Sequence, residues 1–209
     1  MSAIKLYRHP LSGHSHRVEL LLSLLNIDAE IIDVDLMKGE QKSAEFLEKN
    51  PNGQVPVLQD GSEFYSDSNA ILVYLASQYD VNRTWLPTNA EAAASVQEFL
   101  TVSAGPIAFG PAAARLVTLF GASLDADTAI KLAHSILARL ESRLTNREWL
   151  ATSHPTIADV ANYAYVALAP EGNVSLDEYP NVIAWLKRVE SLDGFVATQA
   201  SAVGLNKAA

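Results

Sequence analysis

The stretch at residues 50–68, which reads NPNGQVPVLQDGSEFYSDS, decides the predicted fold of this chain. It opens with Asn50-Pro51-Asn52-Gly53, a dense cluster of turn formers. The β-branched run at residues 54–58 predicts a short strand, and its proline is expected at an edge or a first residue because proline has no N–H to donate. Asp60-Gly61 is a strong two-residue hairpin signal, so residues 62–65 are predicted to return as a second strand.

The same stretch suits the capture of an extended, peptide-like ligand. An X-Pro bond before a strand can be held cis, which turns the backbone N–H and C=O of Val55 outward beside Pro56. A helix start at Asp67 and Ser68 offers free N–H groups and a hydroxyl to a carboxylate, and the Asp67 carboxylate could hold an amino group. Together these groups would bind a zwitterionic thiol peptide. The alternative is a hairpin docked on a helix, with Asp67 or Ser68 acting only as an N-cap.

The residues on either side of this stretch predict an α/β domain. The sequence predicts strands at residues 3–7 and 31–34, the hairpin, and helices at residues 18–25, 38–49 and 69–78. This β-α-β-α-β-β-α order is the thioredoxin-like order, and its βαβ crossover should be right-handed.

Beyond this domain the sequence predicts helices only. Residues 79–90 carry turn formers and Pro87 and lack periodicity, so they are predicted to be a linker. Helices are predicted at residues 91–119, 125–144, 157–167, 179–189 and 194–200, with a frayed tail from Ser201. Gly105-Pro106 and Gly110-Pro111 should interrupt the first of these helices. The expected organisation is therefore a thioredoxin-like domain at 1–78, a linker at 79–90 and an all-helical domain at 91–209.

Two motifs at this separation resemble those of the cytosolic glutathione transferases. They are Gln54-Val55-Pro56 and Asp67-Ser68-Asn69-Ala70-Ile71. The resemblance covers essentially the whole chain, since Thr156-Ile157-Ala158-Asp159, a capping-box variant, recurs in the helical domain of that family. It implies that the cis-proline loop pairs with the cysteinyl backbone of glutathione and that the Asp67-Ser68 pair holds the γ-glutamyl end. The family more often has Glu at position 67.

Ser12 is the candidate catalytic residue. It lies between a predicted strand and a predicted helix start, where N–H groups and the helix dipole favour an anion. A thiol placed there should ionise more readily than its free pKa of about 8.5 allows. The spacing from Ser12 to Arg17 resembles that of the serine-type zeta and cysteine-type omega glutathione transferases. The resemblance implies that the Ser12 hydroxyl donates a hydrogen bond to the glutathione thiolate; the alternative is an ordinary N-cap serine.

Other residues near Ser12 compete for the catalytic role. Tyr7 ends the first strand, as the catalytic residue of the tyrosine-type transferases does, but its spacing to the helix arginine is one residue shorter than theirs. Ser15 lies a turn further on and is expected to point away. His14 and His16 are expected to be helix-surface or interdomain residues, because neither has an obvious carboxylate partner. The sequence shows no metal-ligand set.

Two further residues are candidates for the glycyl end of glutathione. The spacing from Lys42 to Val55 resembles that of the lysine that reaches the glycyl carboxylate in omega-type relatives, and the alternative is a solvated lysine on a polar helix. Gln54 is the second candidate. The pocket for the other substrate is expected to be lined by Pro10, Leu11, Phe109 and residues near Arg115.

Composition excludes several classes of protein. The chain has 209 residues, of which 49% are hydrophobic and 19% charged, so it can form a sizeable core. It contains no cysteine, which excludes disulfides and a catalytic cysteine, so any thiol must come from the ligand. A net charge of −9 disfavours nucleic acid as a partner. The start of the chain lacks a signal-peptide pattern and no run of about 18 apolar residues occurs, so we expect a cytoplasmic protein without a membrane span.

These observations predict an enzyme that conjugates glutathione, as co-substrate, to a small hydrophobic electrophile without a metal. The alternatives are a glutathione-dependent peroxidase, isomerase or dehalogenase on the same site, or a non-catalytic binding protein of the same fold. The resemblance also implies a symmetric homodimer. The helix predicted from residue 91 supports a two-fold contact because it carries apolar residues on more than one face, namely Ala92, Ala93, Ala94, Val96, Phe99 and Leu100.

Overall fold

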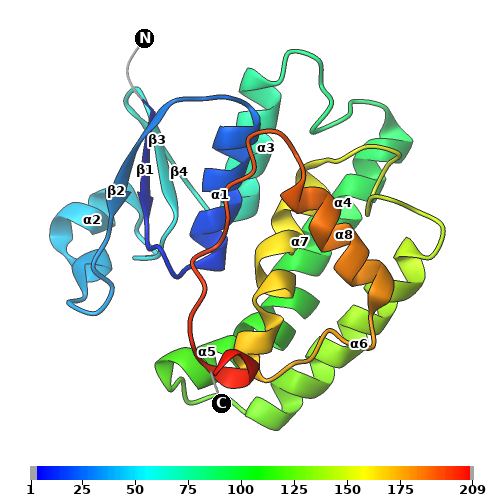
Figure 1. Cartoon of the computed structure of the whole chain (residues 1–209). Helices are drawn as coiled ribbons and strands as arrows, with labels where there is room; N and C mark the ends of the chain where they lie inside the picture. The colour runs from blue at the N-terminus through cyan, green and yellow to red at the C-terminus, as the bar shows by residue number, and fades with distance from the viewer. Residues whose placement is uncertain (1–3, 208–209) are drawn as a thin grey trace.

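A computed structural model of the chain describes residues 4–207 and places a four-stranded sheet beside a bundle of helices (Figure 1). The strands are β1 (Ile4–Arg8), β2 (Ala29–Asp33), β3 (Val57–Asp60) and β4 (Glu63–Ser66). Their order in the sheet is β2-β1-β3-β4, with β1 and β2 parallel and β3 antiparallel to β1 and β4. The predicted hairpin is therefore confirmed, although its first strand begins at Val57 and not at residue 54. Ala3, the first residue of the predicted first strand, lies outside the described residues.

The helices of the first half cover both faces of the sheet. They are α1 (Gly13–Leu24), the short 3₁₀ turn η1 (Glu40–Lys42) with α2 (Ala44–Lys49), and α3 (Ser68–Tyr79). Figure 1 shows α1 and α3 between the sheet and the helix bundle, and α2 beyond the opposite face of the sheet. The thioredoxin-like order of strands and helices is confirmed.

The second half of the described chain consists of helices and loops. Its helices are α4 (Ala90–Ala104), η2 (Ala108–Ala112), α5 (Ala113–Phe120), α6 (Ala126–Leu144), α7 (Ile157–Ala167), η3 (Ala169–Gly172), α8 (Pro180–Glu190) and η4 (Gly204–Asn206). Gly105 ends α4, and η2 is a π-helical segment that contains Pro111, so the predicted interruption between residues 104 and 113 is confirmed. The predicted fold class, a thioredoxin-like α/β domain followed by an all-α domain, is confirmed as well.

Helix α7 is the centre of the bundle. It is buried on almost every side, as its apolar sequence predicts, and it contacts both α1 and α4. The capping box at Thr156 and Asp159 is formed, and the buried Asp159 carboxylate also accepts hydrogen bonds from the Leu150 backbone and the Trp185 indole. One continuous hydrophobic core therefore joins the sheet, α1, α3 and the bundle.

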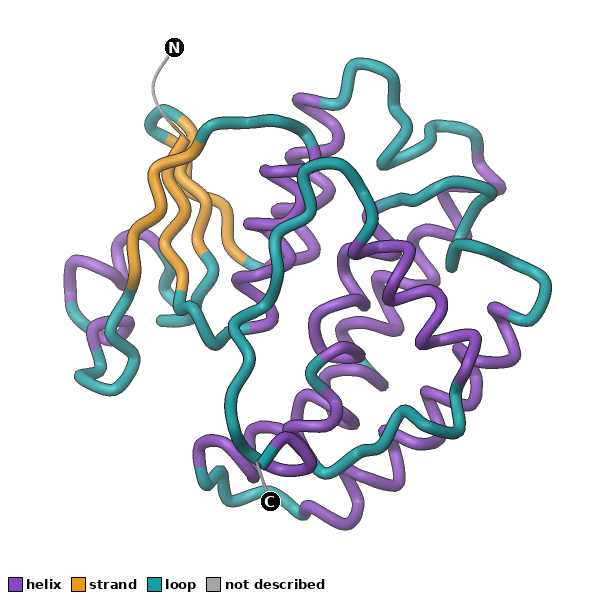
Figure 2. The backbone as a smooth tube through the Cα atoms, in the orientation of Figure 1, coloured by secondary structure: helices purple, strands orange, loops and turns teal. Residues whose placement is uncertain are grey.

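The C-terminal segment corrects two predictions. No helix forms at residues 194–200; this part of the chain is extended coil that runs from the end of α8 along α1 to α5 (Figures 1 and 2). The tail is not frayed up to residue 207, because Val196 accepts a hydrogen bond from His16 and Ser201 donates one to Glu171. These are long-range contacts that helical periodicity does not encode. Residues 208–209 lie outside the described part.

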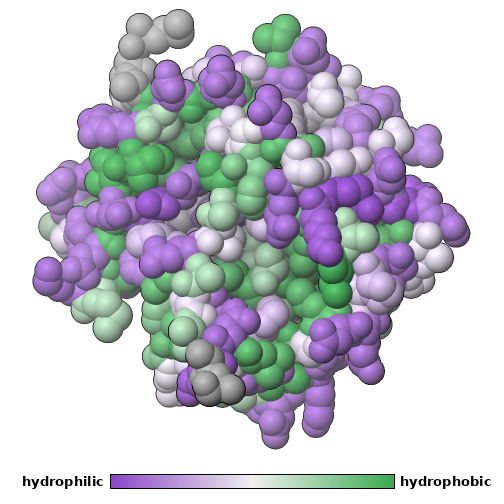
Figure 3. Space-filling view, viewed as in Figure 1, coloured by the Kyte–Doolittle hydropathy of each residue, from purple (hydrophilic) through white to green (hydrophobic). Residues whose placement is uncertain are grey.

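The helical run Ala90–Phe120 is long and apolar enough, by length and composition alone, to cross a membrane. Its most apolar window is 56% buried inside the protein, where α4 packs against α7 and η2 packs against α6. Core helices of globular domains pass the same test, and the packing of this run accounts for its apolar sequence. Figure 3 shows neutral and apolar residues over the junction of sheet and bundle, with hydrophilic residues around them.

Candidate active site

A cavity of about 520 Å³ opens where the sheet meets the helix bundle. Its volume falls in the range that small-molecule sites occupy. One side is polar and is formed by the loop before α1, the loop before β3 and the start of α3; the other side is formed by η2, α5 and α7. The predicted site residues that line it are Ser12, Gln54, Val55, Pro56, Asp67 and Ser68.

Ser12 is the N-cap of α1. Its backbone is extended (φ −86°, ψ 115°), its N–H donates to His9 O, and its Oγ accepts a 3.2 Å hydrogen bond from the Ser15 N–H. The hydroxyl proton is therefore available to a group in the cavity, since Oγ uses a lone pair for the cap. Ser12 can therefore fill both roles that its sequence suggested, because it caps the helix and can also donate a hydrogen bond at the positive end of that helix.

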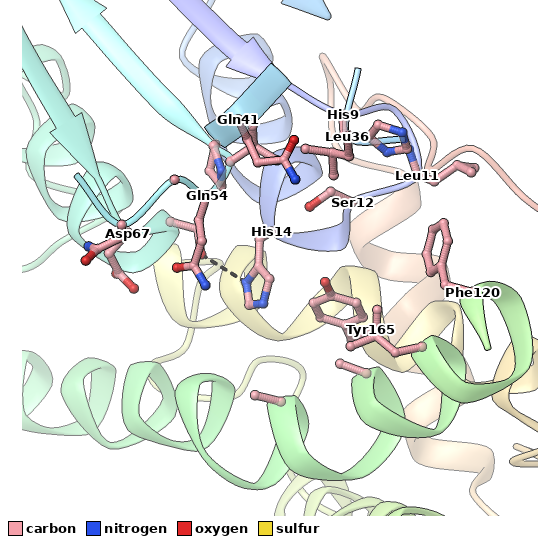
Figure 4. A pocket seen from close by; sticks show the side chains of 18 of the residues that line it. His9, Leu11, Ser12, His14, Leu36, Gln41, Gln54, Asp67, Phe120 and Tyr165 are labelled. Atoms are coloured by element: carbon pink, nitrogen blue, oxygen red, sulfur yellow. Dashed lines mark hydrogen bonds between the residues drawn. The ribbon is translucent and has the colours of Figure 1, made fainter. Parts of the chain in front are cut away.

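The loop before β3 presents backbone groups to the cavity. The Val55–Pro56 peptide bond is cis, as the sequence suggested. The buried side chain of Asn50 holds the loop in place, because its Nδ2 donates a 2.8 Å hydrogen bond to Gln54 O. Gly53 has φ +57°, a conformation that favours glycine. Figure 4 shows the Gln54 side chain directed into the cavity.

Asp67 caps α3 in an unusual backbone conformation. Its φ is +67°, which is uncommon for a residue other than glycine and often marks a functional position. Oδ1 accepts hydrogen bonds of 2.9 Å from the N–H groups of both Asn69 and Ala70. Within residues 4–207, Oδ2 has no hydrogen-bond donor, so this oxygen can bind a ligand while the first one caps the helix.

A buried arginine lies beneath the Asp67-Ser68 pair. Arg17 is 1% exposed, and burial lowers the pKa of its guanidinium to about 10, opposed by Tyr165 and Asp67. Its Nη1 donates to Ser68 Oγ at 3.1 Å and to His14 Nδ1 at 2.9 Å. A buried cation beside a helix N-terminus favours binding of a carboxylate at this end of the cavity.

His14 lies at the cavity wall rather than on the helix surface, contrary to one of the sequence expectations. Burial, with a smaller effect of Arg17, lowers the pKa of its imidazole to about 3, so the ring is neutral at pH 7. Because the Arg17 guanidinium can only donate, the shared hydrogen bond assigns Nδ1 as the acceptor and Nε2 as the protonated nitrogen.

Three rival residues do not line the cavity and have structural partners of their own. The Tyr7 hydroxyl donates to the Gln59 side chain at 3.1 Å, and its ring packs against Phe46. Ser15 is buried and accepts a hydrogen bond from the His9 N–H. His16 is an interdomain residue, as expected, because its Nε2 lies 2.8 Å from Val196 O in the C-terminal segment.

Lys42 lies beside the cavity rather than in its wall. Its Nζ donates a 3.2 Å hydrogen bond to the backbone oxygen of Asn52, and Asn52 lines the cavity. Gln41, the residue before it, does line the cavity. The role of Lys42 at the glycyl end of a ligand therefore stays a prediction, and Gln41 is a candidate that the sequence did not reveal.

The apolar side of the cavity differs in part from its prediction. Leu11 and Arg115 line it, as expected, but Phe109 points to solvent and is 66% exposed. The π-helical turn of η2 changes the helical register, so Ala108 and Ala112 face the cavity instead. Pro10 is not among the lining residues. The apolar wall consists of Leu11, Leu36, Ala108, Ala112, Leu116 and Phe120.

Two more residues of the wall come from the helix bundle. Tyr165 on α7 is buried and faces Ser12 (Figure 4), and Arg115 on α5 is 2% exposed. A tyrosine on an apolar helix cannot be separated from core residues by its pattern. Arg115 could have been recognised from the sequence, because it is the single arginine in the apolar helix α5 and a buried charge needs a partner. Within residues 4–207, no group of three or more His, Cys, Asp or Glu side chains could hold a metal ion.

Known proteins share this architecture. The family models described as the N-terminal and C-terminal domains of glutathione S-transferase match residues 2–77 and 114–193. Glutathione S-transferase 3 of Zea mays is 34% identical, covering 96% of this chain and 95% of that protein. A possible glutathione S-transferase of Rhodopseudomonas palustris has a TM-score of 0.87 at 29% identity, covering 96% of this chain and all of that one.

A glutathione transferase homologue of Drosophila mojavensis, solved with bound glutathione, has a TM-score of 0.84 at 28% identity and covers 92% of this chain and 89% of its own. Sequence relationship over nearly the full length, both domain matches and the shared fold agree. This chain therefore belongs to the glutathione S-transferase family.

Proposed function

We propose that this protein transfers the thiolate of glutathione to a small hydrophobic electrophile and that Ser12 stabilises the thiolate. The observation that carries the proposal is the placement of Ser12, the Val55-Pro56 loop and Asp67-Ser68 around one cavity with an apolar wall opposite them. Transferase activity with glutathione as co-substrate follows from the family, since relatives named glutathione S-transferase match almost the whole chain.

The polar side of the cavity has a group for each part of the peptide. The backbone of Val55, beside the cis bond, would pair with the cysteinyl residue. The α3 N-terminus at Ser68 and the Arg17 charge below it would hold the γ-glutamyl carboxylate, while Asp67 Oδ2 would accept from the amino group. Gln54, which lines the cavity, would contact the glycyl end, and Lys42 beside the cavity is the other candidate for it.

The chemistry requires only that the thiol ionise and that its sulfur meet the electrophile. The Ser12 hydroxyl donates to the sulfur anion at the N-terminus of α1, and the thiol proton leaves to water because the neutral His14 already accepts from Arg17. The sulfur then forms a bond to carbon, and the leaving group departs with its electron pair. In an addition, the electron pair of the attacked double bond moves onto the acceptor instead, and the acceptor takes a proton from water. Positioning and electrostatics supply the catalysis.

The apolar wall sets the class of the second substrate. Leu116 and Phe120 on α5 face the polar side across the cavity, so an electrophile with a hydrocarbon or aromatic body would be bound next to the sulfur. This substrate class is part of the proposal. The cytoplasmic location expected from the sequence stays a prediction.

A homodimer also belongs to this proposal and is supported mainly by the family. The surplus of apolar residues on α4 is smaller than the sequence suggested, because Val96, Phe99 and Leu100 are buried in the chain's own core. What remains for a two-fold contact is a strip of α4 with half-exposed Ala92 and Ala93 and exposed Ala94, and Val73 on α3 is half-exposed as well. Small side chains of this kind allow close helix approach in an isologous interface.

Retention on immobilised glutathione, followed by turnover with a panel of small electrophiles and peroxides, tests the function. We expect retention, elution by free glutathione and loss of free thiol in step with the formation of conjugate from an apolar aromatic electrophile. Retention without any turnover would instead indicate a non-catalytic binding protein. Turnover of peroxides alone would replace the transferase with a peroxidase on the same site.

A further inference from the structure

We propose that Tyr165 is a second catalytic residue, whose hydroxyl donates a hydrogen bond to the glutathione thiolate beside Ser12. The inference rests on the proposed function and deepens it, because it assigns part of the thiolate site to the helix bundle. Tyr165 lies on α7, far from Ser12 in sequence, yet both side chains line the same cavity. In Figure 4 the phenol ring of Tyr165 stands upright below Ser12 with its oxygen directed toward that residue and the cavity.

The close approach of Tyr165 depends on Gly13, the first residue of α1. A Cβ atom built on Gly13 would lie 2.8 Å from Tyr165 Cζ and 2.9 Å from Cε1. Real side chains essentially never make such contacts, so only glycine allows the ring to lie against the backbone at the helix start. Cζ is the carbon that carries the hydroxyl. The phenol oxygen is therefore held next to the Ser12-Gly13 backbone, at the end of α1 where an anion is favoured.

The ring is held in this orientation by its neighbours. The Arg17 guanidinium lies over its face at 5.5 Å from the centroid, and the His14 ring meets it edge-on at 5.0 Å. Tyr165 is only 6% exposed. A buried, packed phenol loses little conformational freedom when it donates to a ligand, so its hydroxyl is pre-organised in the way that effective catalytic donors are.

The partners of the phenol oxygen leave its proton for the cavity. The phenol oxygen lies near the His14 backbone N–H and the Ser12 side chain, and both groups act to lower the pKa of the phenol against the larger effect of burial. A backbone N–H can only donate, so the approach of this group to a lone pair of the phenol oxygen leaves the phenol proton free to point toward another acceptor. A sulfur anion bound at Ser12 would lie within the space shared by the two hydroxyls and would accept from both.

Tyr165 acts as a donor and not as a base. Burial raises the pKa of its phenol, opposed by Arg17 of α1 and Arg115 of α5, so the hydroxyl keeps its proton at neutral pH. His14, the other titratable neighbour on α1, is neutral there. No bond to Tyr165 breaks in the reaction. Its contribution is to stabilise the thiolate, whose proton has already left to water.

Tyr165→Phe removes the hydroxyl and keeps the ring, and Tyr163→Phe is the matched control. Tyr163 lies on the same helix, but its hydroxyl donates to Glu190 at 3.1 Å, away from the cavity. We expect Tyr165→Phe to raise the apparent pKa of bound glutathione, followed by ultraviolet absorbance of the thiolate, by about one unit. At pH 6.5 kcat should fall about tenfold, and the loss should shrink as the pH rises. Affinity for glutathione should change less than twofold, and Tyr163→Phe should leave all three values unchanged.

Gly13→Ala is a second variant that should remove the Tyr165 hydroxyl from the thiolate, since the new methyl group must displace the Tyr165 ring. Like Tyr165→Phe, it should raise the apparent pKa of bound glutathione. An unchanged thiol pKa and unchanged kcat in Tyr165→Phe, in an otherwise active enzyme, would refute the role of Tyr165 while leaving the transferase assignment intact. A wild-type protein that binds no glutathione would instead overturn the proposed function, and with it the assignment of Tyr165.

Discussion

The Arg115 guanidinium donates a 2.7 Å hydrogen bond to the backbone oxygen of Leu11, the residue immediately before Ser12. A side chain of the helix bundle therefore fixes the loop that carries the proposed catalytic hydroxyl. Arg115 Nε also donates to Glu171 Oε2 at 2.6 Å, and the other oxygen of Glu171 accepts from the Ser201 N–H at 2.7 Å. This buried network links the catalytic loop, α5, η3 and the C-terminal segment.

Glu171→Gln should destabilise the protein and impair catalysis together. The Arg115–Glu171 pair is buried, with side chains 2% and 0% exposed, and removal of one charge leaves the other without compensation. We expect a loss of about 3–5 kcal/mol in the free energy of unfolding, measured with denaturant. The control is Glu98→Gln, which breaks a half-exposed pair with Arg139 and should cost about 1 kcal/mol or less. Equal losses in the two variants would show that the buried network has no special role.

Asp67→Asn should weaken glutathione binding while preserving the fold. The amide oxygen of asparagine can still cap α3, but it cannot form a charge-assisted contact with the ligand's amino group, which is worth about 1.5–3 kcal/mol. Titration calorimetry measures the affinity, and thermal unfolding measures stability. Asp125→Asn, at the N-cap of α6 and away from the cavity, is the control and should leave affinity unchanged. If Asp67→Asn binds glutathione as tightly as the wild type, Asp67 is only a cap.

Stability should fall as the pH drops below about 6.5, partly because of His16. Burial lowers the pKa of this imidazole from 6.5 to about 4, opposed by its contact with Val196 O. Above pH 6.5 both folded and unfolded states are neutral at this position. Between 6.5 and 4 only the unfolded state gains the proton, so up to about 1.4 kcal/mol is lost for each pH unit.

Denaturant unfolding of wild type and His16→Gln at pH 7 and pH 5 tests this linkage. The variant should lose less stability than the wild type over this interval, because one proton-binding group of the unfolded state is gone. His154→Gln serves as the control for removal of a histidine, because the His154 Nδ1 lies 3.1 Å from the Pro155 oxygen of its own loop. Identical pH slopes for wild type and His16→Gln would contradict the proposed origin of the acid sensitivity.

Light scattering at micromolar concentration tests the proposed homodimer. We expect a mass about twice the 22.6 kDa of the single chain, with about 1,200–2,000 Å² or more of surface buried. Ala93→Glu, which places a charge on the half-exposed strip of α4, should shift the mass toward that of the monomer. Wild-type protein with the mass of one chain would refute the dimer.

The order of elements and much of the polar side of the cavity could be predicted because they depend on local chemistry. Asp60-Gly61 selects a hairpin whatever surrounds it, and Thr156 with Asp159 starts a helix through contacts within a few residues. The cap positions of Ser12 and Asp67 could be predicted for the same reason, since each is followed by an apolar helix whose first N–H groups need an acceptor, whereas their roles toward glutathione rest on the resemblance.

The contributions of the bundle could not be predicted because they depend on packing between distant segments. Tyr165 reaches the cavity only because Gly13 lies opposite it, and nothing in the local sequence of α7 records that contact. Phe109 was predicted to line the cavity, but the π-helical turn changes the helical register and directs its side chain to solvent. The extended course of residues 195–200 is set by contacts with α1 and η3 on either side of it, so the helix predicted at residues 194–200 was wrong.

The kinetics of Ser12→Ala test the central claim most directly, with Tyr7→Phe as the matched variant. Loss of the Ser12 hydroxyl should lower kcat about 100-fold or more and raise the apparent pKa of bound glutathione, while affinity for glutathione and the melting temperature change little. Tyr7→Phe should retain wild-type turnover, because that hydroxyl is bound to Gln59 outside the cavity. Near wild-type turnover in Ser12→Ala, with loss of activity in Tyr7→Phe, would contradict the account.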